Sequence, residues 1–160
     1  MAEKYLSDPL FMEKARPYIE DPAFLKLRDT QHHNDSVYIH TLRVAFLAYR
    51  IGKKRGISGD ELLRGALFHD LYFHDWRDKE FIFNHGWSHP VIALENARKL
   101  FPPITEKEAN IISSHMWPFN FKNPPKSKEA FIVSLADKLV SSGEILLMPI
   151  YFVKRLFKRG

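Results

Sequence analysis

The sequence predicts an all-α domain, and three observations lead to this interpretation. Apolar residues recur at helical spacing in several stretches. Residues typical of helix starts stand just ahead of these stretches, as in Thr105-Glu106-Lys107-Glu108. Segments containing proline or glycine separate one stretch from the next. The chain has 160 residues, 45% of them apolar, which is enough for one well-packed domain and too few for two, so we expect a single domain over residues 1–160.

The first thirty residues carry two short predicted helices. One lies around Asp8 to Arg16, and the other runs from Pro22 to about Asp29. Pro17 and the Asp21-Pro22 pair break them, because proline disfavours helical backbone in the residue before it. We expect both to be packing helices.

A longer helix follows a polar turn and runs to about Lys54. Asp35 or Ser36 can cap its first turn, and Gly52 and Gly56 mark its end. Its apolar stripe is broad, which indicates burial on both flanks.

The next predicted helix ends in a His-Asp pair. Ser58-Gly59-Asp60-Glu61 is typical of a capping box, and His69-Asp70 follows about three turns later. Adjacent helical residues point about 100° apart, so both can face one site only near a helix end, where the backbone is free to adjust. The sequence therefore predicts that this pair closes the helix.

Residues from Tyr72 to Ser88 fit no helical period and are predicted to form a long loop of aromatic and charged residues. Loops of this length in compact domains are often binding walls or lids. The alternative is a structural loop pinned by core aromatics.

Three further helices are predicted in the C-terminal half. The first has Ser88 as its N-cap and Pro90 in its first turn, and Phe101-Pro102-Pro103 stops it. The second starts at the capping box at Thr105, and the third starts at about Ser127. The tail from Ile145 to Phe157 is amphipathic and basic at its end, and we expect it to cap the core rather than anchor the chain in a membrane.

Composition narrows the classes of function. The chain has no cysteine, so any metal must be held by nitrogen and oxygen ligands. With 24 Lys and Arg against 19 Asp and Glu the formal charge is +5, which favours anionic ligands, but the basic residues are scattered and nucleic acid is disfavoured. The sequence contains neither a secretory signal nor a membrane span, so we expect a cytoplasmic protein that has no membrane partner.

Six polar residues stand on or at the ends of the predicted apolar helices: His40, His69, Asp70, His89, His115 and Asp137. Each one alone can be a core residue with its own partner, and a buried carboxylate without a partner is costly. A shared metal site accounts for all six at once, because imidazole and carboxylate groups are metal ligands.

The order His, His-Asp, His, His, Asp resembles the HD-domain phosphohydrolase superfamily, in particular its six-ligand branch that holds two metal ions. The similarity extends over about residues 31–145. The stretches that carry it are His40-Thr41-Leu42-Arg43-Val44-Ala45, Gly65-Ala66-Leu67-Phe68-His69-Asp70, His85-Gly86-Trp87-Ser88-His89-Pro90, Ile112-Ser113-Ser114-His115-Met116 and Leu135-Ala136-Asp137-Lys138. The resemblance implies a helical bundle with a metal site between its helices, and leaves residues 1–30 and 146–160 as packing helices.

The resemblance also assigns roles. It implies that His40, His69, Asp70 and Asp137 hold one metal, that Asp70 bridges to a second, and that His89 and His115 complete the second. One or two divalent transition metal ions (Fe, Mn, Zn, Ni or Co) would then supply hydroxide for attack on phosphorus. The expected activity is a metal-dependent phosphohydrolase that cleaves a nucleotide or another small phosphorylated metabolite, with Asp70 at the catalytic centre.

Arg43 and Lys138 stand beside ligands and are candidate catalytic groups that contact phosphate oxygens, with salt bridging at the surface as the alternative. Phe73 stands where such families commonly have a lysine, which argues against a step assisted by lysine. There is no Gly-Tyr-Pro extension of the kind found in cyclic-dinucleotide enzymes.

The loop after the His-Asp pair supplies candidate substrate-binding residues, namely His74, Arg77 and His85 among aromatic neighbours. Cations between aromatic faces suit an anion that carries a ring, so we expect nucleotides to be preferred over sugar phosphates. Two alternatives to hydrolysis are a mixed-valent di-iron oxygenase of the same superfamily and a non-catalytic regulatory module that binds metal or nucleotide. The substrate, the metal and the oligomeric state are left open.

Overall fold

A computed structural model describes residues 5–32, 35–73 and 85–157, and it confirms the all-α fold. For residues 31–32, 85–86 and 144–157 only the backbone is described. Nearly all regular structure in these ranges is helical. The exception is an antiparallel pairing of β1 (Gln31–His32) with β2 (Asp35–Ser36).

Helix α1 (Pro9–Ile19) begins at Asp8, whose carboxylate accepts from the backbone N–H of Phe11 at 3.1 Å. The predicted break at Pro17 is wrong, because the helix continues through this residue to Ile19. Its buried stripe of Phe11, Ala15 and Ile19 extends past the proline, so packing outweighs the one hydrogen bond that Pro17 cannot donate.

The second short helix forms in two parts, α2 (Pro22–Leu25) and the 3-10 turn η1 (Lys26–Arg28). Asp21 caps α2 by accepting from the backbone N–H of Ala23 at 2.7 Å. The segment that the sequence predicts as helical is therefore helical up to Arg28.

Helix α3 (Val37–Lys54) has the predicted bounds. Ser36 caps it, with its hydroxyl 3.4 Å from the backbone nitrogen of Ile39. Beyond its end, Gly56 has a positive φ of 69°, a conformation that favours glycine.

Helix α4 (Asp60–Phe68) begins at Gly59, and the predicted capping box at Ser58 is wrong because no side chain caps this helix. The reason lies in another helix. Glu61, the acidic member of the predicted box, accepts instead from Thr105 Oγ1 at 2.9 Å and pairs with Lys107 Nζ at 2.8 Å. Glu61 therefore takes part in a contact between helices and does not cap α4.

Helix α6 (His85–Leu100) begins three residues before the predicted Ser88 cap and has Pro90 in its interior. A proline within the first two turns removes one helical hydrogen bond, a loss that the packing of this helix on α4 and α7 compensates. The part of the predicted loop that covers residues 74–84 lies outside the described residues.

Helix α7 (Glu106–Ser114) has the predicted capping box. The backbone N–H of Glu108 donates to Thr105 Oγ1 at 3.2 Å, and the backbone N–H of Thr105 donates to Glu108 Oε2 at 2.9 Å. Arg64 ties this helix to α4, because its Nε donates to Glu108 Oε1 at 2.6 Å.

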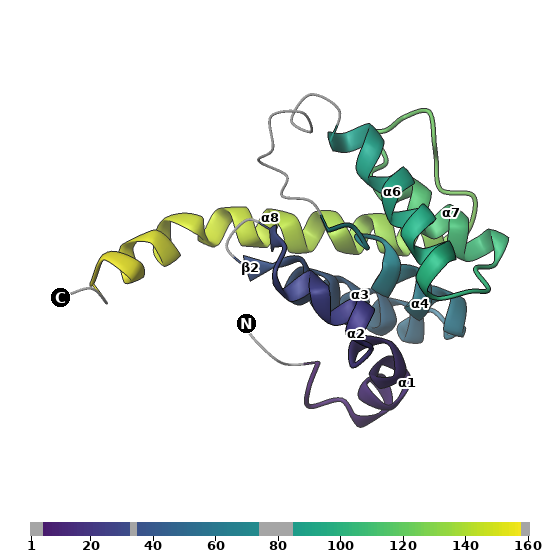
Figure 1. The fold of residues 1–160 in the computed structure, drawn as a ribbon, viewed down its shortest axis with the longest axis horizontal. Coiled ribbons are helices and arrows are strands. Elements are labelled where there is room, and N and C mark those ends of the chain that lie inside the picture. Colours follow the sequence, from purple (N-terminus) through teal and green to yellow (C-terminus); the bar gives the residue numbers. More distant parts are fainter. Residues whose placement is uncertain (1–4, 33–34, 74–84, 158–160) are drawn as a thin grey trace.

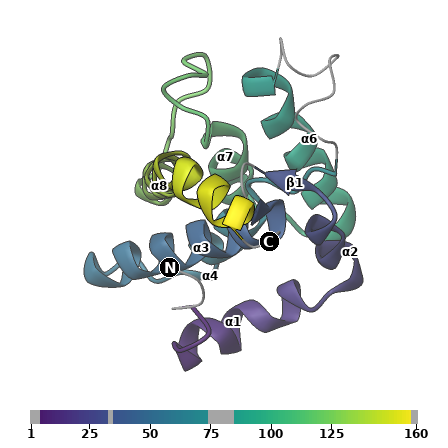
Figure 2. The same ribbon diagram turned by 90° about the vertical axis from the view of Figure 1, so that its left-hand side faces the viewer.

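Helix α8 (Lys128–Phe157) is one continuous helix that includes the predicted tail. Figure 1 shows that its C-terminal end runs out beyond the other helices, and Figure 2 shows the same end pointing toward the viewer. In the part of the chain that the structure describes, no helix has both the length and the apolar character needed to cross a membrane.

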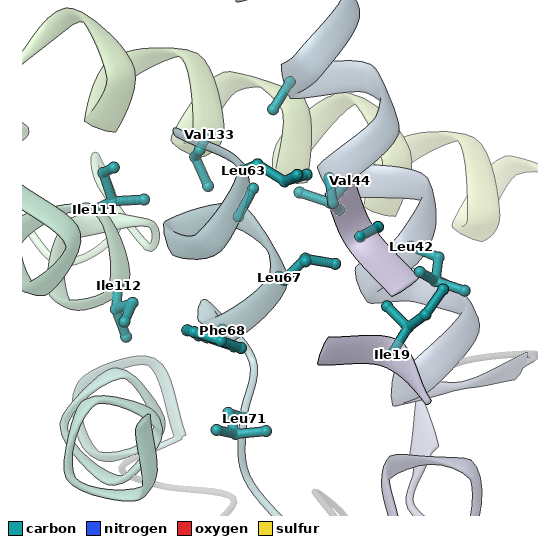
Figure 3. Close-up of a cluster of buried hydrophobic side chains, with 14 of the residues drawn as sticks. Ile19, Leu42, Val44, Leu63, Leu67, Phe68, Leu71, Ile111, Ile112 and Val133 are labelled. Atoms are coloured by element: carbon teal, nitrogen blue, oxygen red, sulfur yellow. The ribbon is translucent and has the colours of Figure 1, made fainter. Parts of the chain in front are cut away.

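Helix α4 lies at the centre of the bundle and contacts α1, α3, α6, α7 and α8. Figure 3 shows Leu67 pointing toward α3, with Phe68 on the side of Ile112. Leu67 and Phe68 are fully buried. The C-terminal end of α4 is therefore held in the interior, and this is the end that carries His69 and Asp70.

Candidate metal centre

Five helices bring the six predicted ligands together in the interior. His40 lies in α3, His89 in α6 and Asp137 in α8, whereas His69 and His115 are the C-caps of α4 and α7. Asp70 follows His69 directly, at the end of the helix as the sequence predicts. All six are buried, and none is more than 7% exposed.

The six residues form two groups of three. In each group one ligand atom from every residue lies within 4.8 Å of the others. The first group is His40, His69 and Asp137, with His40 Nε2 at 3.2 Å and His69 Nε2 at 4.0 Å from Asp137 Oδ1.

The second group is Asp70, His89 and His115. Asp70 Oδ1 lies 3.4 Å from His89 Nε2 and 3.3 Å from His115 Nε2. The two Nε2 atoms are 2.7 Å apart, so all three ligand atoms point at one small volume.

The Asp70 carboxylate faces both groups. Its Oδ1 belongs to the second group, whereas its Oδ2 lies 3.7 Å from His40 Nε2 and 3.7 Å from His69 Nε2 of the first. One carboxylate thus presents one oxygen to each group, which is the arrangement that a bridging ligand requires.

Two backbone carbonyls orient the histidines. His69 Nδ1 lies 2.7 Å from the carbonyl oxygen of Ala66, and His115 Nδ1 lies 2.7 Å from that of Ile112. A carbonyl only accepts, so Nδ1 carries the proton in both rings and the Nε2 lone pair is turned toward the carboxylates. This tautomer is the one that binds metal through Nε2.

The electrostatics of the site also suit a cation. Burial lowers the pKa of His69 to about 4 despite the nearby carboxylates, so this imidazole is neutral at pH 7. Burial alone would raise the pKa of Asp70, but the neighbouring imidazoles, His69 first, hold it well below its ordinary value. The pKa of Asp137 is lowered in the same way, by His40 first.

The site therefore contains two ionised carboxylates in a volume from which water is largely excluded. Buried negative charge of this kind is costly unless a cation compensates it. In addition, His69 Nε2 is fully buried and has no hydrogen-bond partner among the described residues. The imidazole nitrogens and carboxylate oxygens of the site fit a divalent metal ion, because a mixed set of nitrogen and oxygen ligands suits Mn, Fe, Co, Ni and Zn.

Lys138 lies next to this site, as its sequence position predicts. Its ammonium group donates to the backbone carbonyl of His115 and, at 3.1 Å, to Asp137 Oδ2. Lys138 thus connects one residue of each group of three.

Arg43, the other candidate phosphate contact, forms a salt bridge with Asp35 at 2.6 Å. Sequence reasoning missed Ser141, one turn after Asp137, whose hydroxyl donates to Asp137 Oδ1 at 3.3 Å. A serine at i+4 from a helical carboxylate is a signal that could have identified it.

The substrate-binding candidates are less well defined. His74 and Arg77 lie outside the described residues, and His85 is the first residue of α6, where only the backbone is described. Of the aromatics in this stretch, Tyr72 is buried with its ring centroid 5.5 Å from that of His89. Trp87 is 41% exposed and contacts Phe121 edge to face.

Comparison with known proteins identifies the family of the domain that carries the site. The sequence model of the HD domain matches residues 37–141, a range that includes all six candidate ligands. Ribonuclease Y of Thermotoga petrophila and ribonuclease Y of Thermotoga maritima are each 31% identical to the chain over 116 residues. The match covers 71% of this chain and 20% of each relative, so the chain spans about a fifth of the length of these relatives. No solved structure matches the chain.

Proposed function

The chain belongs to the HD-domain family, and from this premise we propose that it is a metal-dependent phosphohydrolase. HD-domain proteins are generally metal-dependent hydrolases. We further propose that the bond cleaved is a phosphoester of a nucleotide or of another small phosphorylated metabolite.

The observation that carries the proposal is the position of Asp70 between the two groups of ligands. Its Oδ2 faces His40 and His69, and its Oδ1 faces His89 and His115. If metal ions occupied both groups, Asp70 would be a ligand common to them, and both ions could act on one phosphoryl group. Paired divalent ions lower the pKa of a water nucleophile and stabilise the charge that develops on the phosphoryl oxygens.

The protein's own residues would prepare this site in three ways. The carbonyl oxygens of Ala66 and Ile112 hold the imidazoles of His69 and His115 in one tautomer and orientation. Lys138 holds the Asp137 carboxylate in place. Burial of Asp70 and Asp137 keeps the charges of these two carboxylates effective, because the surrounding dielectric constant is low.

The substrate class rests on fewer observations. The net charge of +5 favours an anion, and the expected preference for nucleotides depends on His74, Arg77 and His85, whose side chains the structure does not describe. The Thermotoga relatives are named as ribonucleases, so a phosphodiester in RNA is the second substrate class to be compared with mononucleotides.

Two alternatives share the same ligand set. A di-iron oxygenase would consume oxygen when loaded with iron and given an organic substrate. A regulatory module would bind metal or nucleotide without turnover. Release of phosphate, or of a shortened oligonucleotide, under anaerobic conditions separates hydrolysis from both.

The test uses protein purified without chelators and loaded in turn with Mn, Fe, Co, Ni and Zn. The substrates are nucleoside monophosphates, sugar phosphates and a short RNA. Asp70→Asn should lower kcat/KM by more than the roughly 10–100-fold that is typical of losing an outer-shell partner. The matched control is Asp60→Asn, the same change at an exposed carboxylate that pairs with Lys14. Equal activity of the two variants would remove Asp70 from the mechanism, and no turnover with any metal would leave the oxygenase and the regulatory module as the two alternatives.

A further inference from the structure

Exposed apolar side chains gather on the outer faces of α1 and α8. Leu6 and Leu10, before and within α1, are 54% and 55% exposed. Phe131, Leu135 and Leu139 recur at every fourth residue of α8 and are 50%, 39% and 54% exposed. The two faces carry opposite charges, and we propose that the α1 face of one copy of this chain docks antiparallel on the α8 face of a second copy. This inference does not depend on the proposed function.

The α8 face is basic. A groove of about 710 Å³ lies between the end of α3 and the start of α8 and has an apolar floor that includes Ile57, Phe131 and Leu135. Its charged lining consists of Arg55, Lys126 and Lys128, and no carboxylate lines it.

The α1 face is acidic. A groove of about 820 Å³ along this helix is lined by the apolar side chains of Leu6, Pro9, Met12 and Pro17. Its charged lining is Glu13, Glu20 and Asp21 against Arg16. Arg16 pairs with Glu20 at 3.3 Å, and the remaining carboxylates leave the face negative. The two faces therefore match in both apolar character and charge.

The order of charge along each helix fixes the direction of docking. On α8 the cations lie at the N-terminal end and the exposed leucines follow. On α1 the exposed leucines come first and Glu20 follows the last turn. Opposite charges meet only if the helices run antiparallel, which also places the negative end of the α1 dipole beside the positive end of α8.

Helix geometry then gives a register. Glu20 next to Lys128 places Leu10 next to Leu139, because the two intervals measure about 15 Å and about 16 Å at 1.5 Å per residue. In this register the charged end of one face lies opposite the charged end of the other, and Leu10 lies opposite Leu139.

The partner must be a second copy rather than the same chain. Figures 1 and 2 both show α1 and α8 on opposite sides of α3 and α4. Every chain carries both faces on opposite sides of its core, so the contact is head to tail and each copy can bind a further copy at each face.

Cysteine cross-linking tests the contact directly, because the chain has no cysteine of its own. A mixture of Leu10→Cys protein and Leu139→Cys protein should form an intermolecular disulfide under mild oxidation. Leu10→Cys mixed with Phe131→Cys should cross-link poorly, since Phe131 lies about 12 Å from Leu139 along α8. Val91→Cys, 54% exposed on α6, is the matched control partner. Equal yields with Val91→Cys and Leu139→Cys would overturn the docking, and a preference for Phe131→Cys would overturn its direction.

Charge reversal tests the same contact without cysteine. A contact formed by one face of a single helix on another is at the low end of interface areas, so we expect weak self-association, with a dissociation constant on the order of 10 µM by analytical ultracentrifugation. Glu20→Lys or Lys128→Glu alone should weaken self-association about 3–10-fold, and mixing the two variants should restore association. Lys53→Glu, an exposed lysine outside the groove, is the matched control. A chain that stays monomeric at about 100 µM, or an equal loss in the Lys53→Glu variant, would overturn the proposal.

Discussion

His69 and His115 are held by the same local device, although they come from different helices. Each is a helix C-cap, and each ring donates through Nδ1 to the carbonyl three residues earlier. The last carbonyls of a helix lack intrahelical partners, so the ring satisfies one of them while its Nε2 is turned away from the helix. The end of a helix therefore gives a histidine a fixed tautomer without a separate carboxylate partner.

The two groups of ligands should be separable by substitution. Asp137→Asn removes a ligand from the first group only, and His115→Gln removes one from the second only. If both groups bind metal, each variant should retain the ion of the other group. Asp70→Asn should weaken both sites, because its two oxygens face different groups. Elemental analysis after dialysis against a metal buffer measures this, and complete metal loss in His115→Gln with full binding in Asp70→Asn would contradict the bridging role.

Lys138→Met separates two roles of this lysine. If Lys138 orients Asp137 and the His115 backbone, as its hydrogen bonds indicate, metal affinity should fall about 10–100-fold. If it contacts a substrate phosphate instead, KM should rise while the metal affinity stays constant. Isothermal titration with Mn or Zn distinguishes the two, and Lys128→Met, an exposed lysine on the same helix, is the control.

At the scale of elements, the contact between α4 and α7 depends on the absence of a side chain at Gly65. A Cβ at this position would lie 2.7 Å from Ile111 Cγ2 and 2.9 Å from Ile111 Cβ. Gly65→Ala should therefore destabilise the fold by about 1–3 kcal/mol in spite of the better helix propensity of alanine. Denaturant unfolding measures the change.

Two further variants make this prediction specific. Gly143→Ala adds the same methyl group on α8, where nothing lies within 4 Å, and should stabilise by roughly 0.5–1 kcal/mol. Adding Ile111→Ala to Gly65→Ala should cost less than the sum of the single changes, because the clash is then removed. If the destabilisation of the double variant equals the sum of the two single changes, the effect of Gly65→Ala does not arise from a clash with Ile111.

Lys107 links three helices, since it pairs with Glu61 of α4 at 2.8 Å and with Glu129 of α8 at 3.1 Å. Hydrogen bonds from Lys107 and then Thr105 lower the pKa of Glu61 below its ordinary value of 4.5. A lowered carboxyl pKa stabilises the fold above the unfolded pKa, and this contribution is lost as the pH falls. Lys107→Met should therefore lower Tm at about pH 7 and lower it by less at about pH 3. An equal Tm difference at both values would contradict an electrostatic link.

The helices could largely be predicted because their signals are local. Thr105 and Glu108 stand three residues apart and form their capping box within one turn. The same pattern at Ser58 failed, because Glu61 finds its partners on α7, which are distant in sequence. The predicted end of α1 and the predicted start of α6 were also wrong, because both were placed from a proline. Each helix extends past the predicted boundary, since packing against other elements compensates for the proline.

The candidate site could be predicted only in part. Helical spacing identified six polar residues in apolar surroundings, and the family resemblance assigned them to one metal site. The packing of five helices decides which histidines each oxygen of Asp70 faces. No local sequence pattern encodes this arrangement. The Asp35 partner of Arg43 also appears only once the chain is folded.

For the whole molecule, a metal ion bound at this site would make stability depend on a ligand. Its six ligands come from five helices around α4, so an ion bound there would link elements that otherwise rely on apolar packing.

Divalent metal should therefore raise the Tm of the wild-type chain, because it binds the folded state in preference to the unfolded one. At a free metal concentration about 1,000 times the dissociation constant, the gain is about 4 kcal/mol. Asp70→Asn should lose most of this gain, because an amide offers one acceptor oxygen where the carboxylate offers two. Differential scanning calorimetry with chelator or with Mn or Zn compares the four samples, and Asp60→Asn again supplies the surface control. An equal metal-induced rise in Asp70→Asn would mean that the ion binds elsewhere on the protein, and the bridging role of Asp70 would have to be abandoned.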